Sequence, residues 1–441
     1  MIDVPSSKYQ SRSLPEFDEL FLPQRFGWMG GDVANSIALP NLDNADSAPN
    51  VYIWLFGDSL VGTSSGKKRL EAQFISNSVA LMMLWSPADM KSKNLNNNVR
   101  QVNFYWGQDK GQPSAVFHSK KTEVKTTSSI PTVSNSDSYI SYWPVSGIAV
   151  RNDASFHLLV LGQHIKHLAN TDHALVESIA SLSFIELSSD IFYVTNPYSP
   201  PDTWQYECLS FPETKKGRYR WISMFDPNGK SFINDSNDYL YMIGIYEAAS
   251  GTSKSSDAAF DFLSVASRSY QILSRIKVKD LIEENMSKLE IAFVSDMSTE
   301  IDQLEPHWGP DDSDSVPLTL FSPAVTELSI FLDTSGEIPI WVIISLTLLE
   351  QKIRICKSVL LYGPWTCKFV ETVLEPWDDL NTFITYAAKV HVELKSKGND
   401  NRNTSSIIIS YIPNTLSGPG PLFQEGIMKE AYSPKFLEID I

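Results

Sequence analysis

Cysteine is scarce in this chain of 441 residues, which contains only Cys208, Cys356 and Cys367. Three widely spaced cysteines are too few for the disulfide framework of a small secreted domain, and their odd number leaves at least one thiol outside any disulfide. No CxxC pair is present, so a structural zinc site is not expected. Because 42% of the residues are hydrophobic and 11% are aromatic, the chain can instead bury a large core.

Long apolar segments are also missing. The longest candidate, Ile338–Leu349, is shorter than the roughly 18 to 20 residues of a membrane-spanning helix. The segment Met1–Leu20 is polar and charged and lacks the apolar stretch of a signal peptide. We therefore expect a soluble protein without a membrane segment, cytoplasmic by default, although a secreted chain that had lost its leader would look the same.

Positive charge is in deficit, because 36 Lys and Arg residues stand against 52 Asp and Glu residues and the net charge is -16. Such a chain repels phosphate backbones, and we find no stripe of basic and aromatic residues, so nucleic acid is not expected as a partner. The acidity by itself indicates ordinary solubility. We expect a monomer whose partner is a small-molecule or glycan substrate.

Short runs of β-branched and aromatic residues recur along the chain between clusters of Gly, Pro, Asn, Asp and Ser. This pattern is typical of antiparallel β proteins. Ser269–Met286 has a tolerable helical period, and for this stretch helix and strand are equally open. The predicted strands are Ser36–Leu39, Val51–Phe56, Ile75–Met83, Val102–Trp106, Ile148–Val150, Phe156–Leu161, Leu182–Leu187, Ile191–Thr195, Arg218–Phe225, Tyr239–Tyr246, Leu289–Val294, Leu328–Leu332, Ile340–Leu346, Ile353–Leu361, Phe383–Leu394 and Ile407–Tyr411.

The runs group into five units, each with a polar or aromatic first strand, a strongly apolar second strand and one or two outer strands. Five such units predict an all-β fold, namely a single five-bladed β-propeller over residues 1–441. Propellers close their ring with a terminal strand, so we expect Phe436–Ile441 to pair beside Phe17–Leu22. The five units begin near Trp28, Tyr142, Arg218, Thr326 and Phe383.

An ordered series of motifs covers nearly the whole chain. The motifs are Gly30-Gly31-Asp32 with Ser36, Trp54–Ser59, Ser76-Asn77-Ser78, Tyr142-Trp143-Pro144 with Gly147, Thr326–Ser329, Gly363-Pro364-Trp365, Tyr386–Leu394 and Ile409–Asn414. In this order they resemble the blade signatures of five-bladed propellers related to arabinan- and fructan-cleaving glycosidases. The chain departs from that pattern at Val392, where the family has proline, and its second and third units hold no acid that aligns with a glycosidase catalytic triad.

The resemblance implies a central funnel, lined by the first strand of each blade, in which ligands bind. Glycosidic cleavage needs two carboxyl groups, one protonated and one ionised. We predict Asp32 and Glu327 as this pair, because burial in an aromatic funnel would raise the pKa of one of them. His391 is the third catalytic candidate, since it is the one histidine on a predicted first strand, where it alternates with Lys389 and Glu393.

Each catalytic candidate also has a purely structural interpretation. Asp32 follows two glycines and could cap the amides of a turn. Glu327 starts an apolar strand, where an unpaired carboxylate is costly, and an arginine in the funnel would satisfy it without catalysis. His391 could be an acid or base, a metal ligand or a hydrogen-bonded core histidine. No ligand cluster has diagnostic spacing, so neither a metal nor a cofactor is predicted.

The candidates for substrate binding are residues of the same motifs and first strands. Aromatic members could stack on a sugar ring or a hydrocarbon, or could simply pack between blades. Asp58, in Gly57-Asp58-Ser59, also fits a role that stabilises a turn. The full set is Asp58, Asn77, Trp143, Arg218, Arg220, Trp221 and Tyr411.

Three functions remain open at this point. The first is a glycosidase-like hydrolase that acts on a furanoside or related carbohydrate. The second is a cyclase or isomerase of specialised metabolism that uses the funnel for acid–base chemistry on a small hydroxylated or epoxide substrate. The third is a propeller that binds a ligand without catalysis. The fold alone cannot choose among them, because one fold hosts many functions.

Overall fold

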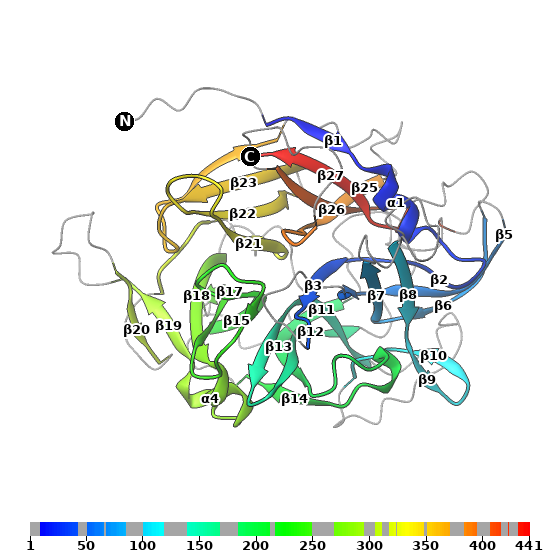
Figure 1. The fold of residues 1–441 in the computed structure, drawn as a ribbon, viewed down its shortest axis with the longest axis horizontal. Helices are drawn as coiled ribbons and strands as arrows, with labels where there is room; N and C mark the ends of the chain where they lie inside the picture. The colour runs from blue at the N-terminus through cyan, green and yellow to red at the C-terminus, as the bar shows by residue number, and fades with distance from the viewer. Residues whose placement is uncertain are drawn as a thin grey trace.

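Strands dominate the computed structural model, and its helices are short, so the protein is all-β (Figure 1). The helical segments are α1 (Pro15–Asp18), η1 (Glu19–Phe21), η3 (Pro201–Thr203), α4 (Val278–Ile282) and η4 (Met286–Lys288). The structure describes the chain except for residues 1–8, 43–50, 66–67, 85–99, 119–138, 168–183, 212–216, 249–268, 295–304, 311–316, 323, 348–350, 371–382, 395–405, 416–421 and 423–430.

Five large sheets follow one another along the chain. The first, β3-β4-β7-β8, contains β3 (Asn35–Leu39), β4 (Val51–Phe56), β7 (Ser78–Leu84) and β8 (Arg100–Tyr105). The second, β14-β13-β12-β11-β16, contains β11 (Tyr139–Asn152), β12 (Ser155–His167), β13 (Phe184–Val194), β14 (Tyr206–Ser210) and β16 (Phe232–Ile233). The third, β15-β17-β18-β19-β20, contains β15 (Gly217–Phe225), β17 (Tyr239–Ala248), β18 (Ser269–Lys277), β19 (Glu290–Phe293) and β20 (His307–Gly309).

The remaining sheets complete the arrangement. The fourth, β21-β22-β23-β24, contains β21 (Leu328–Asp333), β22 (Ile340–Thr347), β23 (Lys352–Ser358) and β24 (Thr366–Phe369). The fifth, β1-β27-β26-β25, contains β1 (Ser11–Ser13), β25 (Phe383–Val390), β26 (Ser406–Thr415) and β27 (Lys435–Asp440). Two small sheets, β2-β5-β6 and β10-β9, contain β2 (Phe26–Gly31), β5 (Ser59–Ser65), β6 (Lys68–Ile75), β9 (Gly107–Asp109) and β10 (Gln112–Ser114).

The first strands of the five large sheets contact one another in turn: β3 with β11, β11 with β15, β15 with β21, β21 with β25, and β25 again with β3. Figure 1 shows the sheets set around a common centre. Residues at the starts of these strands, although far apart in the sequence, therefore lie near one another.

The two ends of the chain meet in the fifth sheet, where β1 pairs antiparallel with β27. The Arg12 guanidinium donates from Nε to the Glu438 carboxylate across this pair at 3.0 Å. The expectation that Phe436–Ile441 pairs beside Phe17–Leu22 was wrong, because most of Phe17–Leu22 is helical and Ser11–Ser13 pairs with β27 instead. Pro15 begins the helix, since its fixed φ suits a first turn and its missing N–H costs nothing there.

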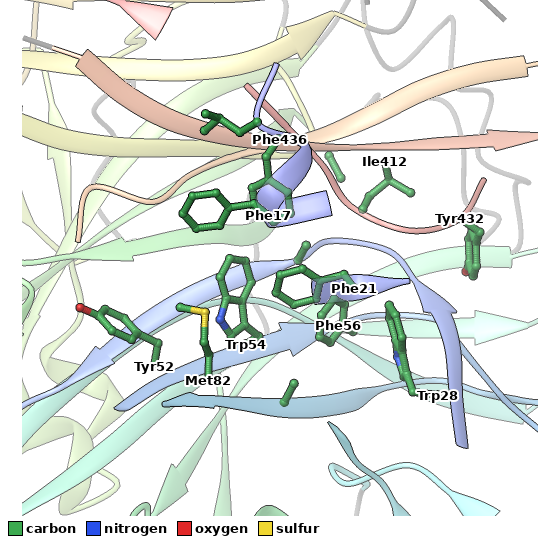
Figure 2. Packing of buried hydrophobic residues seen from close by; sticks show 14 of the residues in the cluster. Phe17, Phe21, Trp28, Tyr52, Trp54, Phe56, Met82, Ile412, Tyr432 and Phe436 are labelled. Carbon is green, nitrogen blue, oxygen red and sulfur yellow. The ribbon is translucent and has the colours of Figure 1, made fainter. Parts of the chain in front are cut away.

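An aromatic cluster lies between this N-terminal segment, the first sheet and β27 (Figure 2). Phe17 and Phe21 are four residues apart, so both face Phe436 of β27, with ring centroids 5.5 and 5.4 Å away. Phe21 also packs on Trp54 of β4 at 4.7 Å. A fully buried large side chain contributes roughly 1.5–3 kcal/mol, so this cluster helps to hold the two ends of the chain against the first sheet.

The ambiguous stretch Ser269–Met286 divides between two structures. Its first half is β18, which pairs with β17 in unbroken register from Ser269 to Lys277. Only Val278–Ile282 and the single turn that begins at Met286 are helical. The first half is a strand because it is buried against β17. An apolar run of this length, taken alone, is compatible with either a helix or a strand.

A single cross-strand disulfide joins Cys356 of β23 to Cys367 of β24, and Cys208 is not part of it. These two cysteines lie opposite each other in the register of the two strands. Over the described residues, no helix has the length and apolar character needed to cross a membrane.

Candidate functional site

Asp32 lies in the bend between β2 and β3, just before the first strand of its sheet. Val33 and Ala34, which follow it, adopt left-handed φ angles of 69° and 50°. This region is costly for non-glycine residues and rare for a β-branched one. Reciprocal backbone bonds hold the bend: Gly57 donates to the Asp32 carbonyl at 3.1 Å, and Asp32 donates to the Asp58 carbonyl at 3.2 Å. Strain held in this way is a common mark of functional sites.

The Asp32 carboxyl group is buried, with 7% of the residue exposed. Its Oδ2 accepts a hydrogen bond from the Tyr386 hydroxyl at 3.3 Å, and its Oδ1 has no hydrogen-bond partner among the described residues. Position 57 must be glycine, because a Cβ there would overlap Oδ1. Burial, followed by the negative charges of Asp58 and Glu327, raises the pKa of Asp32 well above its usual value. Asp32 therefore keeps its proton to a higher pH than an ordinary aspartate does.

Asp58 lies in the turn between β4 and β5 and is partly buried. Trp143 Nε1 of β11 donates to Asp58 Oδ1 at 2.6 Å. Burial raises the pKa of Asp58 to about 8, while the hydrogen bond from Trp143 opposes the rise. Asp58 is thus a carboxyl group that retains its proton near neutrality, and the indole of Trp143 contacts it.

Glu327 immediately precedes β21. The backbone of Ala387 hydrogen-bonds its carboxylate, and the charge of Lys389 acts on it. Burial raises the pKa of Glu327, and both of these interactions oppose the rise. Lys389 is completely buried, and its Nζ donates to the Val145 carbonyl at 3.0 Å. Of the three carboxyl groups, Asp32, Asp58 and Glu327, it is therefore Glu327 that interacts with a buried lysine.

Two tyrosines complete the group, and neither was among the predicted site residues. Asn414 Nδ2 donates to the Tyr386 hydroxyl at 3.2 Å, and the Tyr432 hydroxyl donates to the Asp58 carbonyl at 2.9 Å. Burial, followed by the charge of Asp32, raises the pKa of both phenols well above the usual value. Tyr386 belongs to the motif Tyr386–Leu394, whereas Tyr432 follows a stretch of sequence with no strand pattern and no motif.

His391 contacts a different set of residues. Its Nδ1 lies 2.6 Å from Ser36 Oγ, its Nε2 lies 2.8 Å from Ser410 Oγ, and its ring packs on Trp54 with centroids 4.7 Å apart. Burial, followed by the charge of Lys389, lowers the pKa of His391 to about 3, so the ring is neutral. These contacts join the first sheet to the fifth.

The predicted alternation of Lys389, His391 and Glu393 on one face was wrong, because β25 ends at Val390. Lys389 reaches the Val145 carbonyl, whereas Glu393 and His391 both contact Ser36 Oγ. Asp32 and Glu327 lie just before the first strands β3 and β21.

The other predicted binding residues whose side chains the structure describes pack within or between sheets. Asn77 is fully buried and bonds the backbones of Phe117 and Tyr142, with its Nδ2 donating at 2.9 and 3.0 Å. Trp221 stacks on Tyr219 in the core. The remaining three are Arg220, which is buried on β15, Arg218, which pairs with Glu247 in the backbone register of β15 and β17, and Tyr411, which lies in the core around β26.

A metal centre does not emerge from the geometry. Over the part of the chain that the structure describes, no group of three or more His, Cys, Asp or Glu side chains is arranged to hold a metal ion. The side chains at the site are the carboxyl groups of Asp32 and Asp58, whose pKa values burial raises, the Glu327 carboxyl group, on which the charge of Lys389 acts, two phenols and an indole.

Comparisons with known proteins inform the fold of the chain but not the chemistry of the site. No protein-family model matches the chain, and no curated protein is similar to it in sequence. A Bacteroides ovatus protein to which hydrolase activity has been ascribed is 15% identical, with a TM-score of 0.59, over 100% of this chain and 93% of its own. This likeness indicates a shared fold.

Two further solved structures are more distant. A thermostable family-43 glycoside hydrolase is 9% identical, with a TM-score of 0.37, over 95% of this chain and 90% of its own. The Hadza microbial sialidase Hz136 is 7% identical, with a TM-score of 0.34, over 92% of this chain and 65% of its own.

Proposed function

We propose that this protein is a glycosidase-like hydrolase of furanosides or related carbohydrates, built as a single five-bladed β-propeller over residues 1–441. The ring of contacts among the five first strands supports the propeller, as does the fifth sheet, which joins the two ends of the chain. In propellers, ligands bind where the first strands converge. Asp32 and Glu327 each precede such a strand, so this convergence is the proposed site of reaction.

The proposal rests on one observation: the carboxyl groups of Asp32 and Glu327, whose charges interact, have different surroundings. The carboxyl group of Asp32 accepts a hydrogen bond from a phenol and is buried near other carboxyl groups, whereas the charge of Lys389 acts on Glu327. Surroundings that separate the pKa values of two carboxyl groups are what assign one as acid and the other as base. Asp32 is thus the proposed general acid and Glu327 the ionised partner.

The reaction follows from this assignment. Protonated Asp32 donates its proton to the leaving glycosidic oxygen while the bond to the sugar carbon breaks. The Glu327 carboxylate either attacks that carbon or removes a proton from the water that does. The ionised Glu327 carboxylate also stabilises the positive charge that develops on the sugar carbon.

Hydrolysis predicts that the wild-type protein releases reducing ends from a polymer or aryl furanoside in a panel of arabinan- and fructan-type substrates. Asp32→Asn and Glu327→Gln should each lower kcat/KM by about 10²- to 10⁴-fold, because each removes a proton donor or acceptor used in the transition state. Both replacements keep the shape of the side chain. Reducing-end release measured with purified variants checks this expectation.

The matched control is Glu283→Gln, which removes an exposed carboxylate near α4 and should leave the rate unchanged. Circular dichroism and melting curves establish that the variants fold. No cleavage across the whole panel, or full activity in Asp32→Asn, would remove this proposal.

A cyclase or isomerase is the second candidate, and the presence of two carboxyl groups with raised pKa values, Asp32 and Asp58, favours it. Acetal hydrolysis uses one such donor, whereas acid-initiated cyclisation of an epoxide benefits from a strong donor near aromatic rings that stabilise a cation. Turnover of an epoxide-bearing small molecule, lost in Asp32→Asn and accompanied by no glycan cleavage, would support this alternative.

A further inference from the structure

Two sequons for N-linked glycosylation lie in loops of the third sheet, Asn234-Asp235-Ser236 and Asn285-Met286-Ser287. Asn234 follows β16 and is exposed, whereas Asn285 lies between α4 and η4 and is half-buried. A third sequon, at Asn403, lies outside the described residues. Sequons are frequent in a chain rich in Asn and Ser, so the surroundings of each asparagine decide whether it can carry a glycan.

Both described sequon asparagines use the side-chain oxygen and not the side-chain nitrogen. Asn234 Oδ1 accepts from Arg151 Nη1 at 3.4 Å, and Asn285 Oδ1 accepts from Ser287 Oγ at 2.8 Å. Neither Nδ2 atom donates a hydrogen bond to another described residue. An N-linked glycan replaces one hydrogen of this nitrogen. Both observed hydrogen bonds can therefore persist in the glycosylated protein.

Asparagines outside the sequons include several that do use the nitrogen. Asn77 Nδ2 donates to two buried carbonyl groups, at 2.9 and 3.0 Å. Asn196 Nδ2 donates to the Thr203 carbonyl at 3.2 Å. A sugar on either nitrogen would displace these contacts, and no such obstacle exists at Asn234 or Asn285 among the described residues.

Asn234 lies far from the proposed reaction site along the strands. It directly follows Ile233, which pairs with Val150 of β11. The β11 residue that contacts Asp58 is Trp143. At about 3.3 Å per residue, the distance from Trp143 to Val150 along this strand is roughly 20 Å. A glycan on Asn234 would therefore leave the candidate carboxyl groups accessible.

Asn285 belongs to the same region of the surface. The Lys279 amide in α4 donates to the Ser236 carbonyl at 2.7 Å, so the segment that carries Asn285 lies beside the loop that carries Asn234. Figure 1 shows α4 at the periphery of the molecule, away from the common centre of the sheets. Both glycans would thus project from the outside of the third sheet.

The disulfide between Cys356 and Cys367 is an independent observation about the surroundings in which the chain folds. Disulfides form and persist in secretory compartments and outside the cell, whereas thiols in the cytosol are kept reduced. Asn-x-Ser acceptors are modified in secreted proteins. The disulfide and the two accessible sequons therefore indicate the same kind of compartment.

We propose that Asn234 and Asn285 carry N-linked glycans, added while the chain passes through an oxidising secretory compartment. The donor is a lipid-linked oligosaccharide pyrophosphate. In the transfer, Nδ2 forms a bond to the anomeric carbon, the bond from that carbon to the lipid pyrophosphate breaks, and the amide loses one proton. Neither asparagine takes part in the proposed hydrolysis, so the two proposals stand or fall separately.

The test uses the protein purified from the organism that makes it. Peptide N-glycosidase in heavy-oxygen water converts a glycosylated asparagine to a labelled aspartate, which mass spectrometry of the peptides locates. We expect the label at Asn234 and Asn285 and not at Asn237, which is exposed but belongs to no sequon. A digest without the glycosidase corrects for spontaneous deamidation. Unlabelled asparagine at positions 234 and 285 would overturn the proposal.

The compartment has its own test in the same material. Alkylation of the unfolded protein without a reductant should modify Cys208, which is not part of the disulfide, and should spare Cys356 and Cys367. Both should react once a dithiol is added. Alkylation of all three cysteines without the dithiol would contradict passage through an oxidising compartment.

Variants made in a eukaryotic secretory host separate the two sites. Ser236→Ala and Ser287→Ala should each lose one glycan, seen as a faster band on a gel that glycosidase treatment abolishes, because the sequon requires the hydroxyl. Ser236→Thr and Ser287→Thr keep the hydroxyl and should keep the glycan. Ser231→Ala, at an exposed position before β16, is the matched control. Unchanged mobility in both alanine variants would contradict the assignment.

Discussion

Replacing His391 with glutamine should make the protein markedly less sensitive to acid. His391 is completely buried between the first and fifth sheets, and burial lowers its pKa to about 3 from an ordinary value of 6.5. The unfolded chain gains a proton below pH 6.5 and the folded protein does not, so the stability that this group contributes is present above that pH and is lost as the pH falls toward 3. At roughly 1.4 kcal/mol per pH unit, the loss reaches up to about 5 kcal/mol.

Glutamine can still bond Ser36 and Ser410 but cannot gain the proton. Urea unfolding between pH 4 and pH 7 should therefore show a shallower fall in the free energy of unfolding for His391→Gln than for the wild type. His307→Gln, at an exposed position, is the matched control and should follow the wild-type curve. Parallel curves for the wild type and His391→Gln would show that the histidine is not held neutral.

The strand pattern is the part of the fold that the sequence predicts best. Val51–Phe56 coincides with β4, and Tyr239 begins β17 as expected. These apolar runs are bounded by turn residues, so local pattern and tertiary pairing agree. The run Ile75–Met83 is instead divided between β6 and β7, because Asn77 leaves the strands to bond the backbones of Phe117 and Tyr142. A local sequence pattern cannot show which distant backbone groups Asn77 will bond.

The N-terminal segment illustrates a second limit. Phe17–Leu22 is apolar enough to suggest a strand, yet Phe17 and Phe21 have helical spacing and pack on Phe436. The strand that pairs with β27 is the polar Ser11–Ser13, at the edge of its sheet. Exposed edge strands need little apolar character, so an apolar pattern cannot find them.

For the site, the motifs pointed to Asp32 and Glu327 but not to the residues that control them. Ordered motifs identify positions at strand starts, and a ring of strands brings such positions together. The contacts from Tyr386 and Lys389 depend on a β-bulge in β25, and the contact from Tyr432 depends on a turn before β27. Bulges and turns of this kind have no fixed sequence pattern, so these contacts could not be predicted.

The second large effect concerns Asp58, whose replacement by asparagine should stabilise the protein at alkaline pH. Burial raises the pKa of Asp58 to about 8 from an ordinary value of 3.8. Here the folded protein holds the proton more tightly than the unfolded chain, so the stability from this group is present below pH 3.8 and is lost as the pH rises through 8. The full difference between these two pKa values corresponds to about 6 kcal/mol in the free energy of unfolding. We expect about half of this loss, because Asp58 is partly exposed and shares its titration with Asp32.

Asparagine keeps an oxygen that can accept the hydrogen bond from Trp143 Nε1 and has no charge to lose. The free energy of unfolding of Asp58→Asn, measured in urea from pH 5 to pH 9, should therefore fall less with pH than that of the wild type, and the two curves should separate by about 3 kcal/mol at pH 8.5. Glu283→Gln, which alters an exposed carboxylate, should show no such separation. If Asp58→Asn instead tracks the wild type, Asp58 is ionised in the folded protein. The negative charge that it then places beside Asp32 would raise the pKa of the proposed general acid further, so Asp58→Asn should in that case also shift the basic limb of any pH–rate profile to lower pH.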